Sequence, residues 1–161
     1  MRRDNKEPGL PMNREKCILV AEDNENDLFL LRRAFEAAGL SDAVLHARNG
    51  MDALAYLTGK PPFSDRNQNP FPDLVLVDLQ MPRLGGLDML RALQTHALPK
   101  PVPIVVLSDS FRTSEMEMAE SLGAQEFLMK PTGVAEYREM ALGLHERWLG
   151  DAPKASASAQ V

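Results

Sequence analysis

The chain has 161 residues, 44% of them hydrophobic, and a net charge of −5 at neutral pH. This length fits one domain with a packed core and excludes global disorder. The excess of 23 acidic over 18 basic residues excludes the basic surface typical of proteins that bind nucleic acids. A membrane span needs about 20 consecutive apolar residues, and no run in the sequence approaches that length. The lone cysteine, Cys17, cannot form an internal disulfide, and the N-terminus lacks a signal-peptide pattern, so we expect a cytoplasmic protein.

Short runs typical of β-strands alternate with helical patterns along the chain. The predicted strands are 17–21, 43–47, 74–77, 103–107 and 126–129. Apolar residues at helical spacing follow each of them, over 28–38, 53–57, 87–93, 116–122 and 137–148. This alternation predicts an α/β fold, in which helices cover both faces of a parallel sheet.

The helix ends carry local signals of their own. Asn24 can cap the first helix, and Glu25 and Asp27 in its first turn complement the helix dipole. Glycines that favour helix termination follow three of the patterns, at positions 39, 59 and 123.

The remaining segments are expected to be tails and loops. Residues 1–15 and 150–161 are predicted to be flexible tails around a folded body, 16–149, which holds the acidic charge because the tails are nearly neutral. Residues 60–72 form a long loop with four prolines and with Phe63 and Phe71, which we expect to be exposed. A loop of this length needs a reason, and interaction with a partner is one candidate.

Polar residues follow four of the five predicted strands. Glu22 and Asp23 follow the first, Asp78 the third, Ser108 and Asp109 the fourth, and Lys130 the fifth. In an open α/β sheet, ligands bind outside the carboxyl ends of the strands. We therefore expect these side chains to meet in one crevice.

Three carboxylates that lie close together repel one another unless a cation joins them. Glu22, Asp23 and Asp78 offer the hard oxygen ligands that suit Mg²⁺, and the backbone carbonyl of Gln80 is a plausible further ligand.

A carboxylate can also act as a nucleophile toward phosphorus, and Asp78 is the best candidate because it ends a central strand. Phosphoryl transfer needs charge stabilisation, which the Lys130 ammonium and the Ser108 hydroxyl can supply.

Each of these residues also has an ordinary structural interpretation. An acidic pair after a strand is usually a helix cap, Asp78 and Ser108 can cap the following turns, and a lysine before a proline is normally a solvated loop charge. These alternatives lose force because four separate strand ends satisfy one chemical need.

These residues resemble the receiver domain of two-component response regulators. The matching strings are 18–24, 73–82 followed by Gly85 and Gly86, 105–108, and 129–131. The resemblance implies a flavodoxin-like, doubly wound sheet of five parallel strands in the order 2-1-3-4-5. It also implies that Asp78, with Mg²⁺ bound, accepts a phosphoryl group from a sensor histidine kinase. Such a protein is no enzyme, but it assists its own phosphorylation and dephosphorylation.

A closer likeness is to the stand-alone regulators that serve bacterial phytochromes. The strings that carry it are 22–27, 49–57, the 60–72 loop and 145–149. This resemblance implies a light-sensing kinase as the partner.

The resemblance to receivers also implies a conformational switch that responds to phosphorylation. Ser108 and Phe127 occupy the positions of the hydroxyl and aromatic residues that respond to phosphorylation in receivers, although Phe127 is equally consistent with a plain core residue. The family usually has a small residue where this chain has Asp109. We expect Asp109 and Gln80 to tune the lifetime of the phosphoryl group.

The output is expected to be protein contact rather than DNA binding, because nothing after residue 149 could form a DNA-binding module. Trp148 and Leu149 close the last helix, and we expect them to contact a second subunit of a homodimer, unless both fold onto their own core. Two other functions remain open: a phosphorylation-independent pseudo-receiver, and a haloacid-dehalogenase-type phosphatase. The phosphatase would need an acid at Gln80, and the pseudo-receiver would normally lack one of the site residues.

Overall fold

A computed structural model describes residues 15–40 and 43–150. Apart from Glu15 and Gly150, the predicted tails lie outside these residues. Ten regular elements and a final π-turn follow in chain order: β1 (Cys17–Ala21), α1 (Glu25–Ala37), β2 (Ala43–Ala47), α2 (Gly50–Thr58), β3 (Leu74–Asp78), α3 (Gly86–Leu93), β4 (Ile104–Ser108), α4 (Thr113–Ser121), β5 (Glu126–Met129), α5 (Val134–Leu144) and η1 (His145–Leu149). Within the described part of the chain, no helix is long and apolar enough to cross a membrane.

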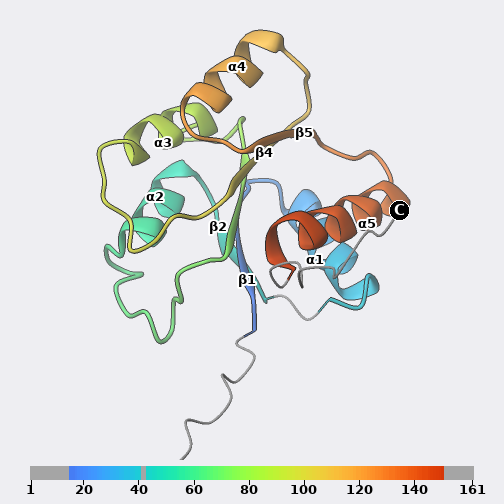
Figure 1. Cartoon of the computed structure of the whole chain (residues 1–161), viewed down its shortest axis with the longest axis horizontal. Helices are drawn as coiled ribbons and strands as arrows, with labels where there is room; N and C mark the ends of the chain where they lie inside the picture. The colour runs from blue at the N-terminus through green and yellow to red at the C-terminus, as the bar shows by residue number, and fades with distance from the viewer. Residues whose placement is uncertain (1–14, 41–42, 151–161) are drawn as a thin grey trace, which may run out of the picture.

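The five strands form one parallel sheet in the order β2-β1-β3-β4-β5. Helices α1 and α5 lie together on one face of it, and α2 and α3 lie on the other, with α4 above them beside β5 (Figure 1). The predicted α/β fold and strand order are therefore confirmed.

The central strands are apolar on both sides because the sheet is covered on both faces. In β3, Leu74 and Leu76 pack into the core under α1 and α5, whereas Val75 and Val77 pack into the core under α2 and α3. The same alternation holds in β1 and β4. A side-chain period of two thus divides one continuous apolar run between two cores.

The predicted start of the first helix is confirmed. The Asn24 side chain caps α1 by accepting hydrogen bonds from the backbone N–H groups of Asn26 and Asp27 at 2.9 and 3.1 Å. The C-terminus of α2 is capped by Gly59, whose φ of 68° is a left-handed conformation that costs glycine little free energy.

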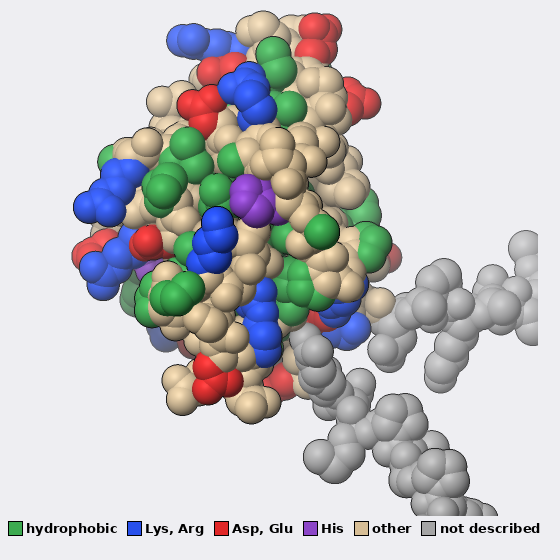
Figure 2. Space-filling model, turned by 90° about the vertical axis from the view of Figure 1, so that its left-hand side faces the viewer, with side chains coloured by type: hydrophobic (Ala, Val, Ile, Leu, Met, Phe, Trp, Pro, Cys, Tyr) green, Lys and Arg blue, Asp and Glu red, His purple; other side chains and the backbone are tan. Residues whose placement is uncertain are grey.

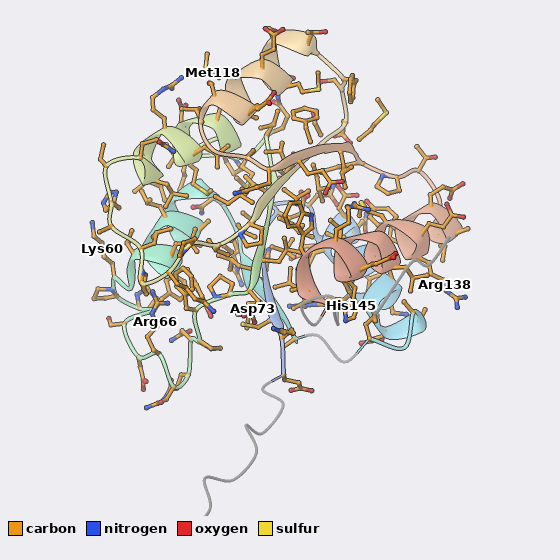
Figure 3. The ribbon with its side chains drawn as sticks, viewed as in Figure 1. Lys60, Arg66, Asp73, Met118, Arg138 and His145 are labelled. Atoms are coloured by element: carbon orange, nitrogen blue, oxygen red, sulfur yellow. The ribbon has the colours of Figure 1, made fainter. Side chains whose placement is uncertain are left out.

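The 60–72 loop is fastened to the body, which corrects the expectation that its phenylalanines are exposed. Phe71 is buried, and the half-buried Phe63 lies with its ring centroid 5.1 Å from that of Tyr56 on α2. Arg66 donates hydrogen bonds to the backbone carbonyls of Tyr56 and Leu57, at 2.8 and 3.1 Å. Figure 3 shows Arg66 on the loop below the end of α2. The loop therefore satisfies carbonyls that the end of a helix leaves free.

The end of the chain's last helix also differs from expectation. Helix α5 continues into η1, where the Gly150 N–H reaches back to the His145 carbonyl at 2.7 Å. Leu149 is 2% exposed and packs into its own core, so it cannot serve as the predicted subunit contact in this conformation. Trp148 is half-buried, and its indole N–H donates to Glu126 at 2.8 Å.

The charged side chains do not form a continuous basic stripe on the face made by α2, α3 and the 60–72 loop. Figure 2 shows lysines and arginines on this face interspersed with apolar and neutral side chains. This distribution agrees with the acidic net charge of the chain.

Candidate functional site

The parallel register brings the carboxyl ends of the central strands to one edge of the sheet. Asp78 is the last residue of β3 and Ser108 the last of β4, and each strand is paired in register with its neighbour. Glu22 directly follows β1 and Lys130 directly follows β5. All four side chains are buried, although all are polar.

The Lys130 ammonium lies at the centre of this cluster. Its Nζ is 2.8 Å from Glu22 Oε2, 2.9 Å from Asp27 Oδ2 and 3.0 Å from Asp78 Oδ2. An ammonium has three N–H donors, so these three carboxylates take all of them. A buried charge needs such partners to offset its loss of hydration.

Burial and ion pairing act in opposite directions on this group. Burial alone would lower the pKa of Lys130, but hydrogen bonds to the three carboxylates outweigh it and raise the pKa above its ordinary value. The lysine therefore stays charged over the whole physiological range.

The pKa of Glu22 reflects the burial of its carboxyl group. Burial raises its pKa from 4.5 to about 7, and the neighbouring Asp78 adds to this effect. Hydrogen bonds from Lys130 and from the Asn24 N–H oppose the rise without cancelling it. At neutral pH this carboxyl is only partly ionised unless further positive charge enters the site.

Three of the carboxylates can hold a cation. Glu22, Asp23 and Asp78 each offer a carboxylate oxygen, and these oxygens lie within 4.8 Å of one another. Glu22 and Asp78 are buried, whereas Asp23 is exposed and leaves the cluster open to solvent. Such an all-oxygen donor set fits a hard divalent cation. The Gln80 peptide lies beside it, because its N–H donates to Asp78 Oδ1 at 3.1 Å.

Asp27 is the site residue that the sequence analysis missed. The sequence predicts only that Asp27 complements a helix dipole, yet its side chain contacts Lys130, 103 residues away. Its Oδ1 also accepts a 3.4 Å hydrogen bond from the Tyr137 hydroxyl of α5. One signal was present: Asp27 lies four residues before Leu31, on the buried stripe of α1, at the end that begins beside the site.

Tyr137, a residue of α5, is buried in the core that α1 and α5 form with the sheet. Burial, followed by the charge of Asp27, raises the pKa of its hydroxyl to about 12. The hydroxyl is therefore protonated at neutral pH, and it is the donor in its bond to Asp27.

The other predicted residues lie around this centre. The Ser108 Oγ accepts a hydrogen bond from the Ser110 N–H at 3.2 Å. Phe127 is half-buried against the core and meets the ring of Phe111 edge-on at 5.8 Å. The side chains of Asp109 and Gln80 are exposed beside the site.

Comparison with known proteins identifies the fold family and similar regulators. Residues 18–142 match the family model described as "Response regulator receiver domain". Response regulator Rcp1 of Synechocystis is 26% identical over 137 residues, which cover 85% of this chain and 91% of Rcp1. A solved structure of Rcp1, described as its Mn²⁺-bound form, has a TM-score of 0.73 at 25% identity and covers 85% of this chain and 96% of that one.

Two further structures are similar over nearly their whole length. Response regulator RPA3017, described as acting in red light signalling of R. palustris, has a TM-score of 0.78 at 33% identity, and the match covers 85% of this chain and 96% of that one. The phosphorylated cyanobacterial phytochrome response regulator RcpA has a TM-score of 0.77 at 28% identity, with coverage of 86% and 96%.

Proposed function

This chain belongs to the response regulator receiver family of two-component signalling, and from that premise we propose that Asp78 is its phosphoacceptor. The observation that carries the proposal is the position of Asp78: at the end of β3, 3.0 Å from the Lys130 ammonium and within 4.8 Å of two further carboxylates. Members of this family are generally signalling proteins rather than enzymes. Any catalysis by this chain concerns its own phosphorylation and dephosphorylation.

The chemistry is a phosphoryl transfer onto a carboxylate. One Asp78 oxygen forms a bond to phosphorus while the phosphorus–nitrogen bond of a phosphohistidine breaks and leaves its electron pair on the imidazole. Lys130 neutralises part of the charge on the phosphoryl oxygens, and the Ser108 hydroxyl donates a hydrogen bond to one of them. The Gln80 N–H holds Asp78 in position.

We assign the acidic cluster to Mg²⁺, with Glu22, Asp23 and Asp78 as ligands and the Gln80 carbonyl as a further one. The bound ion supplies positive charge that offsets the repulsion between the phosphoryl oxygens and the carboxylates. The similar regulator Rcp1 is described in an Mn²⁺-bound form, which supports the binding of a divalent cation by this chain.

In this proposal the phosphodonor is a sensor histidine kinase. We assign that kinase to the bacterial phytochromes, which sense light. The likeness to RPA3017, described in red light signalling, and to RcpA, described as a phytochrome response regulator, supports this partner. A cytoplasmic location is part of this proposal. The receiver itself comprises 16–149 in this assignment.

The output is contact with another protein, and Ser108 with Phe127 forms the switch that controls it. Phosphorylation draws Ser108 toward the phosphoryl group and lets the half-buried Phe127 turn inward. A homodimer contact at Trp148 remains part of the proposal, whereas Leu149 is excluded from it by its burial. Sedimentation showing only monomers at about tens of micromolar, with and without a phosphoryl mimic, would contradict the dimer.

Intact mass measurement after incubation with acetyl phosphate and Mg²⁺ tests the phosphoacceptor. The wild type should gain the mass of one phosphoryl group, Asp78→Asn should gain none, and Asp88→Asn, at an exposed position, should behave as the wild type. Absence of an adduct in the wild type, from acetyl phosphate and from a phosphorylated kinase, would instead indicate a pseudo-receiver.

The lifetime of the adduct tests the role of the residues beside it. The side chains of Asp109 and Gln80 are exposed beside Asp78. In this proposal they contact the water molecule that hydrolyses the phosphoryl group. Asp109→Ala should change the rate of dephosphorylation, measured as the decay of the adduct mass. Equal rates in wild type and variant would remove Asp109 from the assignment.

A further inference from the structure

The Lys130 ammonium has no N–H left for a phosphoryl group. Glu22, Asp27 and Asp78 accept its three hydrogen bonds at 2.8, 2.9 and 3.0 Å. Phosphorylation adds about −1.5 to −2 charge and three strong acceptor oxygens at this position. For Lys130 to bind the phosphoryl group, at least one of its present contacts has to be given up.

The three contacts differ in what their loss would cost. The Glu22 side chain is 1% exposed, so water cannot replace Lys130 there, and only the Mg²⁺ proposed for the same carboxylate would offset the loss. The Asp27 side chain is 25% exposed, and water can replace the ammonium there. Asp78 is the phosphorylated residue itself. Of the two acids that stay unmodified, Asp27 is therefore the one whose contact with Lys130 water alone can replace.

We propose that Asp27 is a positioning residue that holds the Lys130 ammonium in the unphosphorylated protein and releases it to the phosphoryl group. This inference rests on the proposed function, because it assigns a regulatory role beside the same phosphoacceptor. Asp27 reaches the site from α1, while Lys130 follows β5, so the contact joins opposite ends of the folded chain.

The release of Lys130 has a consequence for α5. Asp27 Oδ1 accepts from the Tyr137 hydroxyl at 3.4 Å, which is long for a hydrogen bond to a carboxylate. Once Lys130 leaves, Asp27 loses its cationic partner and becomes a stronger acceptor. The Tyr137 hydrogen bond then shortens and draws α5 toward α1, so that phosphorylation is sensed on the face of the sheet opposite Phe127.

The two tyrosines of the chain make this change observable. Tyr137 lies in the core under α1 and α5, whereas Tyr56 lies in the core on the other face and donates to the Pro70 carbonyl at 2.9 Å. Protein labelled with 3-fluorotyrosine should give two ¹⁹F resonances, which Tyr137→Phe assigns. Adding beryllofluoride with Mg²⁺ to the wild type should shift the Tyr137 resonance more than that of Tyr56.

The kinetic test uses Asp27→Asn, which keeps the size of the side chain and removes its charge. Lys130 is then held less tightly, so phosphorylation by acetyl phosphate should be about threefold to tenfold faster than in the wild type. In the same variant, beryllofluoride should no longer shift the Tyr137 resonance. The matched control is Glu25→Gln, which removes one charge from an exposed position in the same helical turn and should leave the rate within about twofold.

Three results would overturn the inference. One is an Asp27→Asn rate that equals or falls below that of Glu25→Gln. Another is a wild-type protein that forms the adduct without a selective shift of Tyr137, a readout that does not depend on how any variant folds. A wild type that forms no adduct and binds no beryllofluoride would overturn the proposed function, and this inference with it.

Discussion

Replacing Glu22 by glutamine should stabilise the protein at neutral pH, because this carboxyl is buried among other acids. The side chain is 1% exposed, and burial raises its pKa from 4.5 to about 7. Each pKa unit corresponds to about 1.4 kcal/mol, so the ionised carboxyl costs the folded state about 3 kcal/mol relative to the unfolded chain.

The pH window of this effect follows from the two pKa values. Below pH 4.5 the carboxyl is mostly protonated in both states and the penalty is absent. Between pH 4.5 and about 7 the unfolded chain loses the proton first, so the free energy of unfolding falls as the pH rises. Glutamine does not titrate and avoids this loss. Glutamine has one acceptor oxygen where glutamate has two, however. The lost hydrogen bond costs the folded state about 1 kcal/mol at every pH.

Urea denaturation followed by circular dichroism measures the effect, with a chelator present so that no cation occupies the site. The advantage of Glu22→Gln over the wild type should grow by about 2–3 kcal/mol between pH 5 and pH 8. Glu25→Gln, at an exposed position, should run parallel to the wild type. A constant difference between Glu22→Gln and wild type over this range would refute the reasoning.

Three further substitutions test how the fold supports the site. Arg66→Ala should lower the free energy of unfolding by about 2 kcal/mol, because carbonyls at the end of α2 lose a charged donor. Urea denaturation measures this loss, with Lys60→Ala at an exposed position as the control. Equal losses in the two variants would contradict the role of Arg66. Glu126→Ala removes the acceptor of the indole N–H of Trp148, the single tryptophan, so acrylamide should quench its fluorescence more strongly; unchanged quenching would mean that the hydrogen bond does not hold the ring. Gly86→Ala would place a Cβ 2.6 Å from a backbone carbonyl oxygen of β3, and we expect the free energy of unfolding to fall by about 1–3 kcal/mol. A melting temperature equal to that of the wild type would show that the backbone moves to make room for the Cβ.

Much of the fold could be predicted because the signals are local. The apolar runs of the central strands and the cap at Asn24 depend on backbone sterics and on residues a few positions away. The general rule for parallel sheets also predicts Asp78 and Lys130 at one edge of the sheet, because both follow the carboxyl ends of strands. The structure puts them 3.0 Å apart.

Residues whose partners are distant in sequence could not be assigned in this way. Asp27 has a sufficient local explanation as a helix acid, and its contact with Lys130 spans 103 residues. Leu149 faces its own core because α5 ends in a π-turn, and that turn depends on backbone hydrogen bonds that no spacing of side chains reveals.

The sequence by itself determined the order of the elements, the parallel sheet and the set of polar residues at its carboxyl edge. Only the tertiary structure decided which carboxylates share the Lys130 ammonium, and that the 60–72 loop is bound to α2 through Arg66. The physical reason is burial. The strength of an ion pair and the pKa of an acid such as Glu22 depend on how much water the packed segments around them exclude, and those segments come from all parts of the chain.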